Sequence, residues 1–122
     1  MHPNPDKEPM RMARRLVVEG DSMRPTLLAG DRVVAVGWGR VQVGDLVAVR
    51  DPREPARVLV KRVMGVDAAG LHLRGDDEDH STDSRHFGPV ARSLLLGRVV
   101  YRYAPPDRAG PLRRDGGAGR GS

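Results

Sequence analysis

The sequence predicts an all-β fold, arranged as a small antiparallel barrel or folded sheet. Short valine-rich runs recur along the chain, and glycine, proline and aspartate separate them. The apolar residues show no convincing 3.6-residue period, which argues against amphipathic helices. Sixteen of the 122 residues are valine, a β-branched residue that favours strands. A chain of this length is expected to form one domain.

Six strands are expected, and each is a run rich in valine or leucine between residues that favour turns. They span residues 16–18, 33–36, 46–49, 58–66, 71–73 and 94–103. Between the first two runs, Pro25 suits the first turn of a helix, so residues 25–29 are expected to form one helical turn. The folded domain is therefore expected at residues 15–103.

Both ends of the chain are expected to be flexible and basic. Residues 1–14 contain three prolines, and residues 104–122 contain five glycines and three prolines. Such segments cannot bury enough apolar surface to offset the entropy lost on ordering. The formal net charge is +5, and residues 1–15 and 104–122 each hold four basic residues against two acidic ones. We therefore expect a flexible N-terminus at residues 1–14 and a disordered basic tail at residues 104–122.

Composition excludes several classes of protein. The chain has no cysteine, which rules out disulfides and thiolate metal sites. No apolar run approaches the roughly 18 residues of a membrane span. The N-terminus lacks the pattern of a secretion signal. The sequence is therefore expected to be cytoplasmic, with no membrane span.

Nucleic acid, metal ions and cofactors are not expected as partners. A nucleic-acid binder usually concentrates positive charge on a folded face, whereas the charge excess here lies mostly at the two ends. Aromatic residues, which stack on single strands, make up only 3% of the chain. The acidic run from Asp76 to His80 lacks the spacing of a calcium loop, so we interpret it as a solvated loop.

Lysine is rare in this chain, which has 19 arginines and two lysines. Lys61 lies in the expected strand 58–66, where alternation places it on the same face as Leu59 and Val63. If that face is buried, desolvation lowers the pKa of the lysine, and its neutral amine becomes a competent general base. The alternative is an edge-strand lysine whose stem lies along apolar surface while its ammonium stays in water.

Ser22 is the candidate nucleophile. It follows the first expected strand and precedes the turn at Pro25. Such a junction exposes a hydroxyl and directs backbone N–H groups toward one point, as an oxyanion hole requires. The alternative is that Ser22 only caps the turn.

Several short motifs follow one another in order around these two residues. They are Gly-Asp-Ser-Met-Arg-Pro-Thr-Leu at residues 20–27, Gly-Asp-Leu-Val at 44–47, Val-Lys-Arg-Val at 60–63, Gly-Asp-Asp at 75–77, Ser-Thr-Asp-Ser-Arg at 81–85, Gly-Pro-Val at 88–90 and Leu-Gly-Arg-Val at 96–99. In order and rough spacing they resemble the motifs of the type I signal peptidase family of Ser–Lys peptidases. The resemblance covers residues 16–103, most of the chain.

This resemblance implies a serine endopeptidase with a Ser–Lys catalytic dyad and a signal-peptidase-like β fold reduced to its minimal catalytic core. Ser22 would be the nucleophile, and Lys61 would accept its proton and later donate one to the leaving amine. Ser81 corresponds to the serine that orients the lysine in the family. Asp83 and Arg85 correspond to a buried ion pair that supports the loop of Ser81.

The family binds its substrate as an added β-strand between the segments that precede the serine and the lysine. The partner implied is therefore a peptide or precursor protein in an extended conformation. The residues expected to contact it are Leu16, Val17, Val18, Glu19, Gly20, Met23, Val58, Leu59 and Val60. Among them, Met23 is expected to be either a wall of the site or a core residue.

Three departures from the family pattern refine these expectations. Gly20 stands where several members carry a hydroxyl residue, so the oxyanion hole would depend on backbone donors such as the Ser22 N–H. Asp77 stands where the family usually has asparagine. Only 21 residues precede Ser22, and they do not form the membrane helix that is usual in the family.

A minimal core without an anchor resembles the branch of nickel-type superoxide dismutase maturation proteases. The role of that branch is to remove a short N-terminal leader from the dismutase precursor, so a nickel superoxide dismutase is the expected substrate. The preference for arginine over lysine and the abundant glycine, alanine and proline also suggest a bacterial source.

Two other functions are compatible with parts of the sequence. A self-cleaving, repressor-type Ser–Lys domain would need a DNA-binding module and a scissile loop before the serine, and the 21 residues there leave no room for either. A catalytically silent module would bind nucleic acid or an anionic membrane through its basic ends, with a strong dependence on salt.

Overall fold

A computed structural model of the chain describes residues 12–114. The strands are β1 (Ala13–Val17), β2 (Arg32–Val36), β3 (Leu46–Asp51), β4 (Glu54–Asp67), β5 (Gly70–Arg74), β6 (Leu95–Ala104) and β7 (Gly110–Pro111). Four short helical turns accompany them, namely η3 (Glu78–His80), α1 (Ser84–Phe87), η4 (Arg92–Leu94) and η5 (Pro106–Arg108). The predicted all-β fold is confirmed, and each of the six expected strands overlaps one of β1 to β6.

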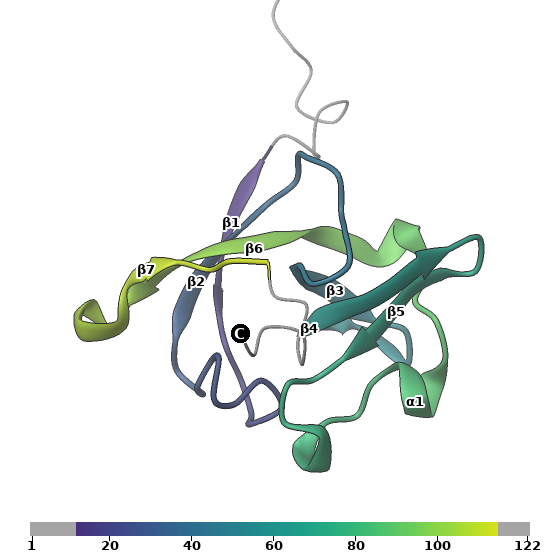
Figure 1. Cartoon of the computed structure of the whole chain (residues 1–122), viewed down its shortest axis with the longest axis horizontal. Helices are drawn as coiled ribbons and strands as arrows, with labels where there is room; N and C mark the ends of the chain where they lie inside the picture. Colours follow the sequence, from purple (N-terminus) through teal and green to yellow (C-terminus); the bar gives the residue numbers. More distant parts are fainter. Residues whose placement is uncertain (1–11, 115–122) are drawn as a thin grey trace, which may run out of the picture.

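All seven strands form one antiparallel sheet. The order along it is β1-β2-β6-β3-β4-β5, and the short β7 pairs with β6 outside this path. β6 is the central element, because it pairs with β2 along part of its length and with β3 along another part. Figure 1 shows β6 running across the molecule, with β1 and β2 toward one side and β3, β4 and β5 toward the other.

β3 is buried on both faces and separates two apolar clusters. Leu46 and Ala48 belong to the cluster formed with β2 and β6, whereas Val47 and Val49 belong to the cluster formed with β4 and β5. Side chains alternate between the two faces of a strand, so a strand that serves two cores must be apolar at every position. This requirement explains the uninterrupted apolar run at residues 46–49.

The long strand β4 changes its partner midway. Residues 58–62 pair with β3, and residues 62–67 pair with β5 on the opposite edge. Among residues 12–114, no strand pairs with the remaining edge of residues 54–61, nor with the edge of β1 that faces away from β2. Two strand edges with unused backbone N–H and C=O groups are therefore left open.

A tight turn between β1 and β2 carries Ser22. Gly20 has a φ of 74°, a left-handed conformation that glycine adopts without steric cost and that turns the chain at the end of β1. The Leu27 N–H donates to the Met23 carbonyl at 2.9 Å, which closes one helical turn. This turn lies at residues 23–27, slightly before its expected position, because Met23 and Leu27 are both fully buried and their packing sets its place.

Asp31 attaches this turn to β6. Its carboxylate accepts hydrogen bonds from the Leu28 N–H at 2.9 Å, from Arg102 at 3.2 Å and from Arg108. Arg102 also donates to the Thr26 carbonyl at 2.8 Å. Burial alone raises the pKa of such a carboxyl, but the Leu28 amide and the two guanidinium groups outweigh burial and hold the pKa of Asp31 below its usual range.

Ordered structure extends beyond both domain boundaries expected from the sequence. At the N-terminal end β1 begins at Ala13, and at the C-terminal end η5 and β7 follow β6. The Leu112 N–H donates to the Val100 carbonyl at 2.9 Å, and Arg114 donates to Asp45 at 2.9 Å. These contacts explain why the fold continues past residue 104. Residues 1–11 and 115–122, where the rest of the expected flexible ends falls, lie outside the described residues.

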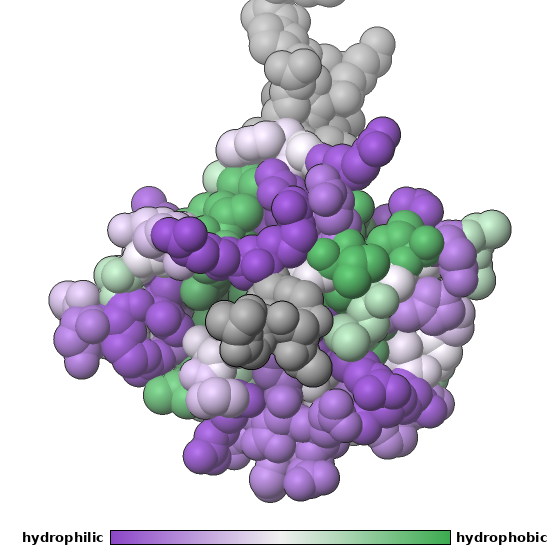
Figure 2. Space-filling model, in the orientation of Figure 1, coloured by the Kyte–Doolittle hydropathy of each residue, from purple (hydrophilic) through white to green (hydrophobic). Residues whose placement is uncertain are grey.

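Hydrophilic side chains predominate on the face seen in Figure 2, and apolar residues form separate small patches on it. The large apolar side chains with substantial exposure in the described part are Met12, Val17, Trp38, Val43, Met64 and Tyr101. None of the helices within residues 12–114 has the length and apolar character needed to span a membrane.

We expect Asp31→Ala to lower the free energy of unfolding by about 3 kcal/mol, because it leaves two guanidinium groups and a backbone N–H without their buried acceptor. Urea unfolding followed by circular dichroism measures the change. Asp107→Ala removes an equal charge from the exposed turn η5 and is the control, with an expected change within about 0.5 kcal/mol. Equal stabilities of the two variants would contradict the role assigned to Asp31.

Candidate active site

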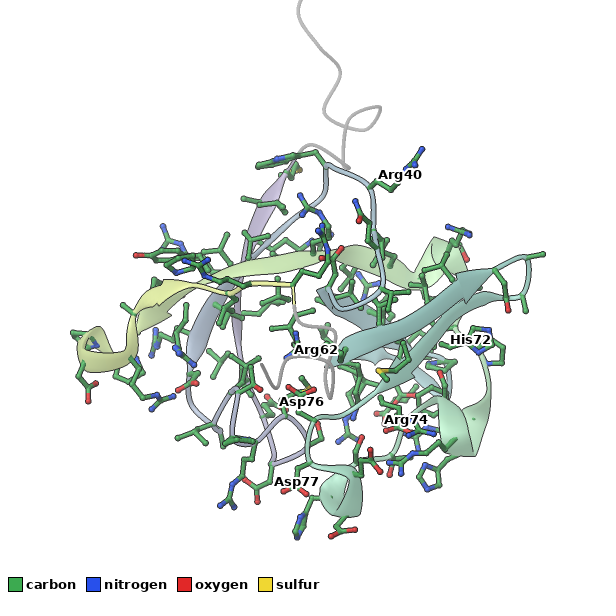
Figure 3. All side chains as sticks on the ribbon, in the orientation of Figure 1. Arg40, Arg62, His72, Arg74, Asp76 and Asp77 are labelled. Carbon is green, nitrogen blue, oxygen red and sulfur yellow. The ribbon has the colours of Figure 1, made fainter. Side chains whose placement is uncertain are left out.

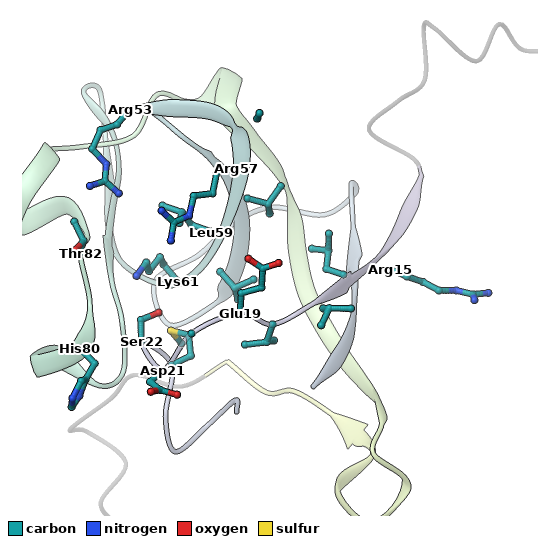
Figure 4. A pocket seen from close by; sticks show the side chains of 18 residues that line it. Arg15, Glu19, Asp21, Ser22, Arg53, Arg57, Leu59, Lys61, His80 and Thr82 are labelled. Atoms are coloured by element: carbon teal, nitrogen blue, oxygen red, sulfur yellow. The ribbon is translucent and has the colours of Figure 1, made fainter. Parts of the chain in front are cut away.

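A groove of about 550 Å³ lies between the open edges of β1 and β4. One wall is the segment from β1 into the Ser22 turn, and the other is the first half of β4; Figure 4 shows both walls with their side chains. The residues that line the groove are Arg15, Leu16, Val17, Val18, Glu19, Gly20, Asp21, Ser22, Met23, Arg53, Ala56, Arg57, Val58, Leu59, Val60, Lys61, His80 and Thr82. Every residue expected to contact a peptide is among them.

Lys61 is buried at one end of this groove. Only 3% of the residue is exposed, and Leu59 and Val63 on the same face of β4 are also buried, as strand alternation predicts. Burial lowers the pKa of Lys61 to about 8, and the nearby guanidinium groups of Arg53, Arg57 and Arg85 act in the same direction. The carboxylate of Asp83 opposes this shift but does not cancel it. With this pKa, about one Lys61 amine in ten is uncharged at pH 7 and about half are uncharged at pH 8.

A chain of hydrogen bonds holds the Lys61 amine in place. Lys61 Nζ lies 2.9 Å from Ser81 Oγ, and Ser81 Oγ donates to Asp83 Oδ2 at 2.7 Å. Asp83 is fully buried and also accepts from the Gly75 N–H at 3.0 Å and from Arg85 Nε at 2.9 Å. Arg85 is partly exposed, so the pair is buried on the carboxylate side only.

Asp83 stays ionised although it is buried. Desolvation by itself raises the pKa of a carboxyl group, but hydrogen bonds from Arg85, the Gly75 amide and Ser81 outweigh it and place the pKa of Asp83 well below its usual range. Its carboxylate also accepts from the Arg85 N–H at the start of α1, where Asp83 is the N-cap residue. The same carboxylate therefore orients Ser81 and begins the helix that follows it.

The backbone of Ser22 is fixed by the segment that follows β5. The Asp77 N–H donates to the Ser22 carbonyl at 2.8 Å. Gly75 packs so closely that a Cβ atom at its position would overlap both the Ser22 carbonyl oxygen and Ser81 Oγ. Gly75 thus allows the turn of Ser22 to approach the serine that holds Lys61. The side chains of Ser22 and Lys61 enter the same end of the groove (Figure 4).

Gly75 lies in one of the ordered motifs, but its steric role could not be predicted from the sequence. Its φ is not in the left-handed region, so the backbone conformation alone does not require glycine there. The requirement is steric and comes from two segments, at residues 22 and 81, that are distant in sequence. Within the sequence, the only signal for this requirement is that the glycine belongs to one of the ordered motifs.

Asp76 is a second element that sequence reasoning missed, because it was interpreted as part of a solvated loop. Arg62 Nη2 donates to Asp76 Oδ2 at 2.7 Å, and the Thr26 hydroxyl donates to the same oxygen at 2.5 Å. Figure 3 shows Arg62 and Asp76 beside each other below β4. Asp76 therefore links β4, through Arg62, to the turn of Ser22, through Thr26. Within residues 12–114, no group of three or more residues of metal-ligand type is placed to hold an ion.

The two walls offer different side chains to a peptide. On the β1 wall Val18 is buried, Val17 is exposed, and Glu19 extends toward the groove (Figure 4). On the β4 wall Leu59 is buried, whereas Val58 and Val60 are half-buried. Met23 is buried with only 1% exposure, so it forms the floor of the site as well as part of the core.

The all-β fold brings a serine hydroxyl and a buried lysine amine to one end of a groove, and these side-chain types are compatible with peptidase chemistry. Comparison with known protein families also indicates a peptidase. Residues 10–70 and 66–104 match the family described as signal peptidase, peptidase S26. The chain belongs to this family, and the family resemblance found in the sequence is confirmed.

Individual relatives are named as subunits of mitochondrial inner membrane proteases. A mitochondrial ATP-independent inner membrane protease subunit 1a of Arabidopsis thaliana is 37% identical, with 79% of this chain and 73% of the relative covered. A subunit 2 of Schizosaccharomyces pombe is 33% identical over 81% of this chain and 69% of its own length. The human subunit 1 is 30% identical over 80% of this chain and 74% of its own length.

These relatives correct the location expected from the sequence. A cytoplasmic protein was expected, and this expectation is wrong, because the relatives are named for a membrane location. A long apolar run identifies proteins that cross a bilayer, so its absence does not indicate where a peptidase acts. The same relatives are eukaryotic and are not named for superoxide dismutase maturation, so they lend no support to the expected branch or to a bacterial source.

We expect Gly75→Ala to destabilise the fold by about 1–3 kcal/mol, because the new methyl group overlaps the Ser22 carbonyl and the Ser81 hydroxyl. Thermal unfolding measures the loss, and amide chemical shifts of residues 22 and 81 report the displacement. Gly65→Ala is the matched control, since a Cβ there meets only His72 at 3.8 Å, an ordinary contact. A Gly75→Ala protein as stable as Gly65→Ala would refute the close approach.

Proposed function

We propose that this protein is a serine endopeptidase in which Ser22 is the nucleophile and Lys61 the general base. The observation that carries the proposal is the buried Lys61 amine, with its pKa lowered to about 8, at the end of the groove that also contains Ser22. An uncharged amine accepts a proton from a serine hydroxyl, whereas an ammonium cannot. Membership of a peptidase family supports the same reaction class.

In the proposed reaction Ser22 Oγ attacks the scissile carbonyl carbon while Lys61 Nζ takes the hydroxyl proton. The intermediate then collapses, the C–N bond breaks, and Lys61 gives the proton to the leaving amine. Water attacks the resulting ester in the second half of the reaction, losing a proton to Lys61, which returns it to Ser22. Ser81 keeps the amine positioned throughout, through its 2.9 Å hydrogen bond.

Backbone groups are the proposed donors to the oxyanion. Within the described part of the chain, no residue accepts a hydrogen bond from the Ser22 N–H. Gly20 carries no side chain that could donate, and its left-handed conformation directs the backbone of residues 20–22 around the site. Preorganised N–H donors at this place typically contribute about 10²–10³ in rate.

The proposed substrate is a peptide segment bound as an extended strand between β1 and β4. Both edges are open, so a peptide can continue the sheet on two sides with main-chain hydrogen bonds. Leu16, Val18 and Leu59 supply apolar contacts for its side chains. A folded protein cannot enter such a groove, which favours a flexible leader of a precursor as the cleaved segment.

The identity of the precursor is a separate question from the chemistry. The nickel superoxide dismutase precursor is the candidate derived from the sequence resemblance. A second class of candidate substrates is suggested by the names of the relatives, namely precursor proteins that reach an inner membrane. Mass spectrometry of each precursor after incubation with the protein distinguishes them by the mass of the released leader.

We expect Ser22→Ala and Lys61→Arg each to reduce peptide cleavage by at least about 10⁴-fold, because one removes the nucleophile and the other replaces the amine with a group that stays protonated. Mass spectrometry of a cleaved precursor measures the rate. Ser93→Ala, an exposed serine in η4, is the control and retains full activity. Cleavage by Lys61→Arg at the wild-type rate would overturn the proposed base.

The cleavage rate is also expected to depend on the protonation of Lys61. Its pKa is lowered in the folded protein, so below pH 8 the ammonium predominates and the rate falls about tenfold per pH unit, whereas above pH 8 it levels off. Steady-state kcat/KM from pH 5 to 10 measures the profile, and the Lys61 side-chain resonance measures the pKa directly. A flat profile between pH 5 and 9 would exclude Lys61 as the base.

A further inference from the structure

The first half of β4 places three different side chains in a row along the groove. Arg57, Leu59 and Lys61 are two residues apart, so strand alternation puts all three on one face. Figure 4 shows them in this order along one wall, with Lys61 nearest Ser22. Leu59 and Lys61 are buried, whereas Arg57 is exposed at the far end. Going away from Ser22, this wall therefore presents first the amine of Lys61, then the apolar side chain of Leu59, and then the guanidinium of Arg57.

The two arginines of this wall differ in what they bind. Arg53 is held by Asp51 through two hydrogen bonds of 3.0 and 2.9 Å, and its guanidinium lies 5.2 Å from the centre of the Phe87 ring. The Arg57 side chain forms no hydrogen bond or ion pair with any residue from 12 to 114. Its charge nevertheless reaches the site, since it contributes to the lowered pKa of Lys61. The positive charge of Arg57 is therefore available to a bound molecule.

We propose that Arg57 is a specificity-determining residue that selects an acidic side chain in the peptide, four residues along the chain from the residue opposite Lys61 at the cleaved bond. This inference rests on the proposed peptidase function. It follows from the open edge of β4, the shared face of Arg57 and Lys61, and the uncompensated guanidinium at the end of the groove.

The position within the peptide follows from strand geometry. Residues directly opposite each other on paired strands have their side chains on the same face of the sheet. A peptide residue opposite Lys61 is close to the reacting bond, one opposite Leu59 faces an apolar surface, and one opposite Arg57 faces a guanidinium. Four residues of strand span about 13 Å, so Arg57 contacts a peptide side chain about that far from the reacting bond.

Glu19, on the opposite wall of the groove, adds a negative charge that also affects which peptides bind. It lies three residues before Ser22 and lines the groove with no ion pair to any described residue. An acidic peptide side chain next to this carboxylate on the β1 wall is repelled, whereas one opposite Arg57 on the β4 wall is attracted. The groove therefore carries charges of opposite sign on its two walls.

The test uses the full-length protein and a series of peptides derived from a cleaved leader. One aspartate, one asparagine or one lysine is placed at each position from six before to six after the scissile bond. We expect a single position, four residues along the peptide from the residue opposite Lys61 at the bond, where aspartate is cleaved with a kcat/KM about fivefold above asparagine and lysine is cleaved less well than asparagine. The preference decreases as salt is raised from 50 to 500 mM.

Variants then assign the preference to Arg57. Arg57→Gln removes it, Arg57→Glu reverses it in favour of lysine, and Arg57→Lys retains it. Arg32→Gln removes the same charge from an exposed position on β2 outside the groove and leaves the preference unchanged. All rates are measured at pH 9.5, where Lys61 is mostly uncharged in every variant, so a change in the lysine pKa does not imitate a change in selection.

The outcomes separate this inference from the proposed function. Cleavage with no preference for charge at any position, or a preference that survives Arg57→Gln, overturns the role of Arg57 while leaving the peptidase intact. No cleavage of any peptide by the wild-type protein overturns the proposed function itself. A ratio of rates within one variant is compared in each case, so partial loss of overall activity does not affect the conclusion.

Discussion

The buried carboxylate of Asp83 is the interaction on which the candidate site depends. It accepts hydrogen bonds from Ser81, from the Gly75 amide and from Arg85, and it caps α1. Ser81 in turn bonds the Lys61 amine. A carboxylate without these donors would be protonated or drawn to water. The same charge raises the pKa of Lys61, so it limits how far burial can lower it. One buried charge thus sets both the position of the amine and its protonation.

The sheet brings the two halves of the site together although they belong to different apolar clusters. Ser22 follows β1, in the cluster of β2 and β6, whereas Lys61 lies on β4, next to the cluster of β5. β3 separates the clusters and has no face toward solvent. Contacts between the two halves carry the alignment of the serine with the lysine. Gly75 against Ser22 and Thr26 with Asp76 are such contacts.

Local patterns predicted much of this structure and part of the site. Valine-rich runs gave all six main strands, because alternation and turn residues act over a few neighbours. Ser22 and Lys61 were indicated by their positions and by ordered motifs. Contacts between distant segments were not predictable in this way. Asp31 with Arg102 and Arg108 joins residues more than 70 positions apart, and neither this network nor the fold beyond residue 104 has a local signature.

The open strand edges of the groove have a consequence for the behaviour of the protein in solution. An edge with unused backbone donors and acceptors can pair with any extended chain, including an unfolded copy of itself, and this is how many β proteins begin to aggregate. Natural sheets discourage such pairing by placing charged side chains at the edge. Arg15, Glu19 and Arg57 border this groove on its two sides. Their charges therefore protect the protein against self-association when the groove is empty.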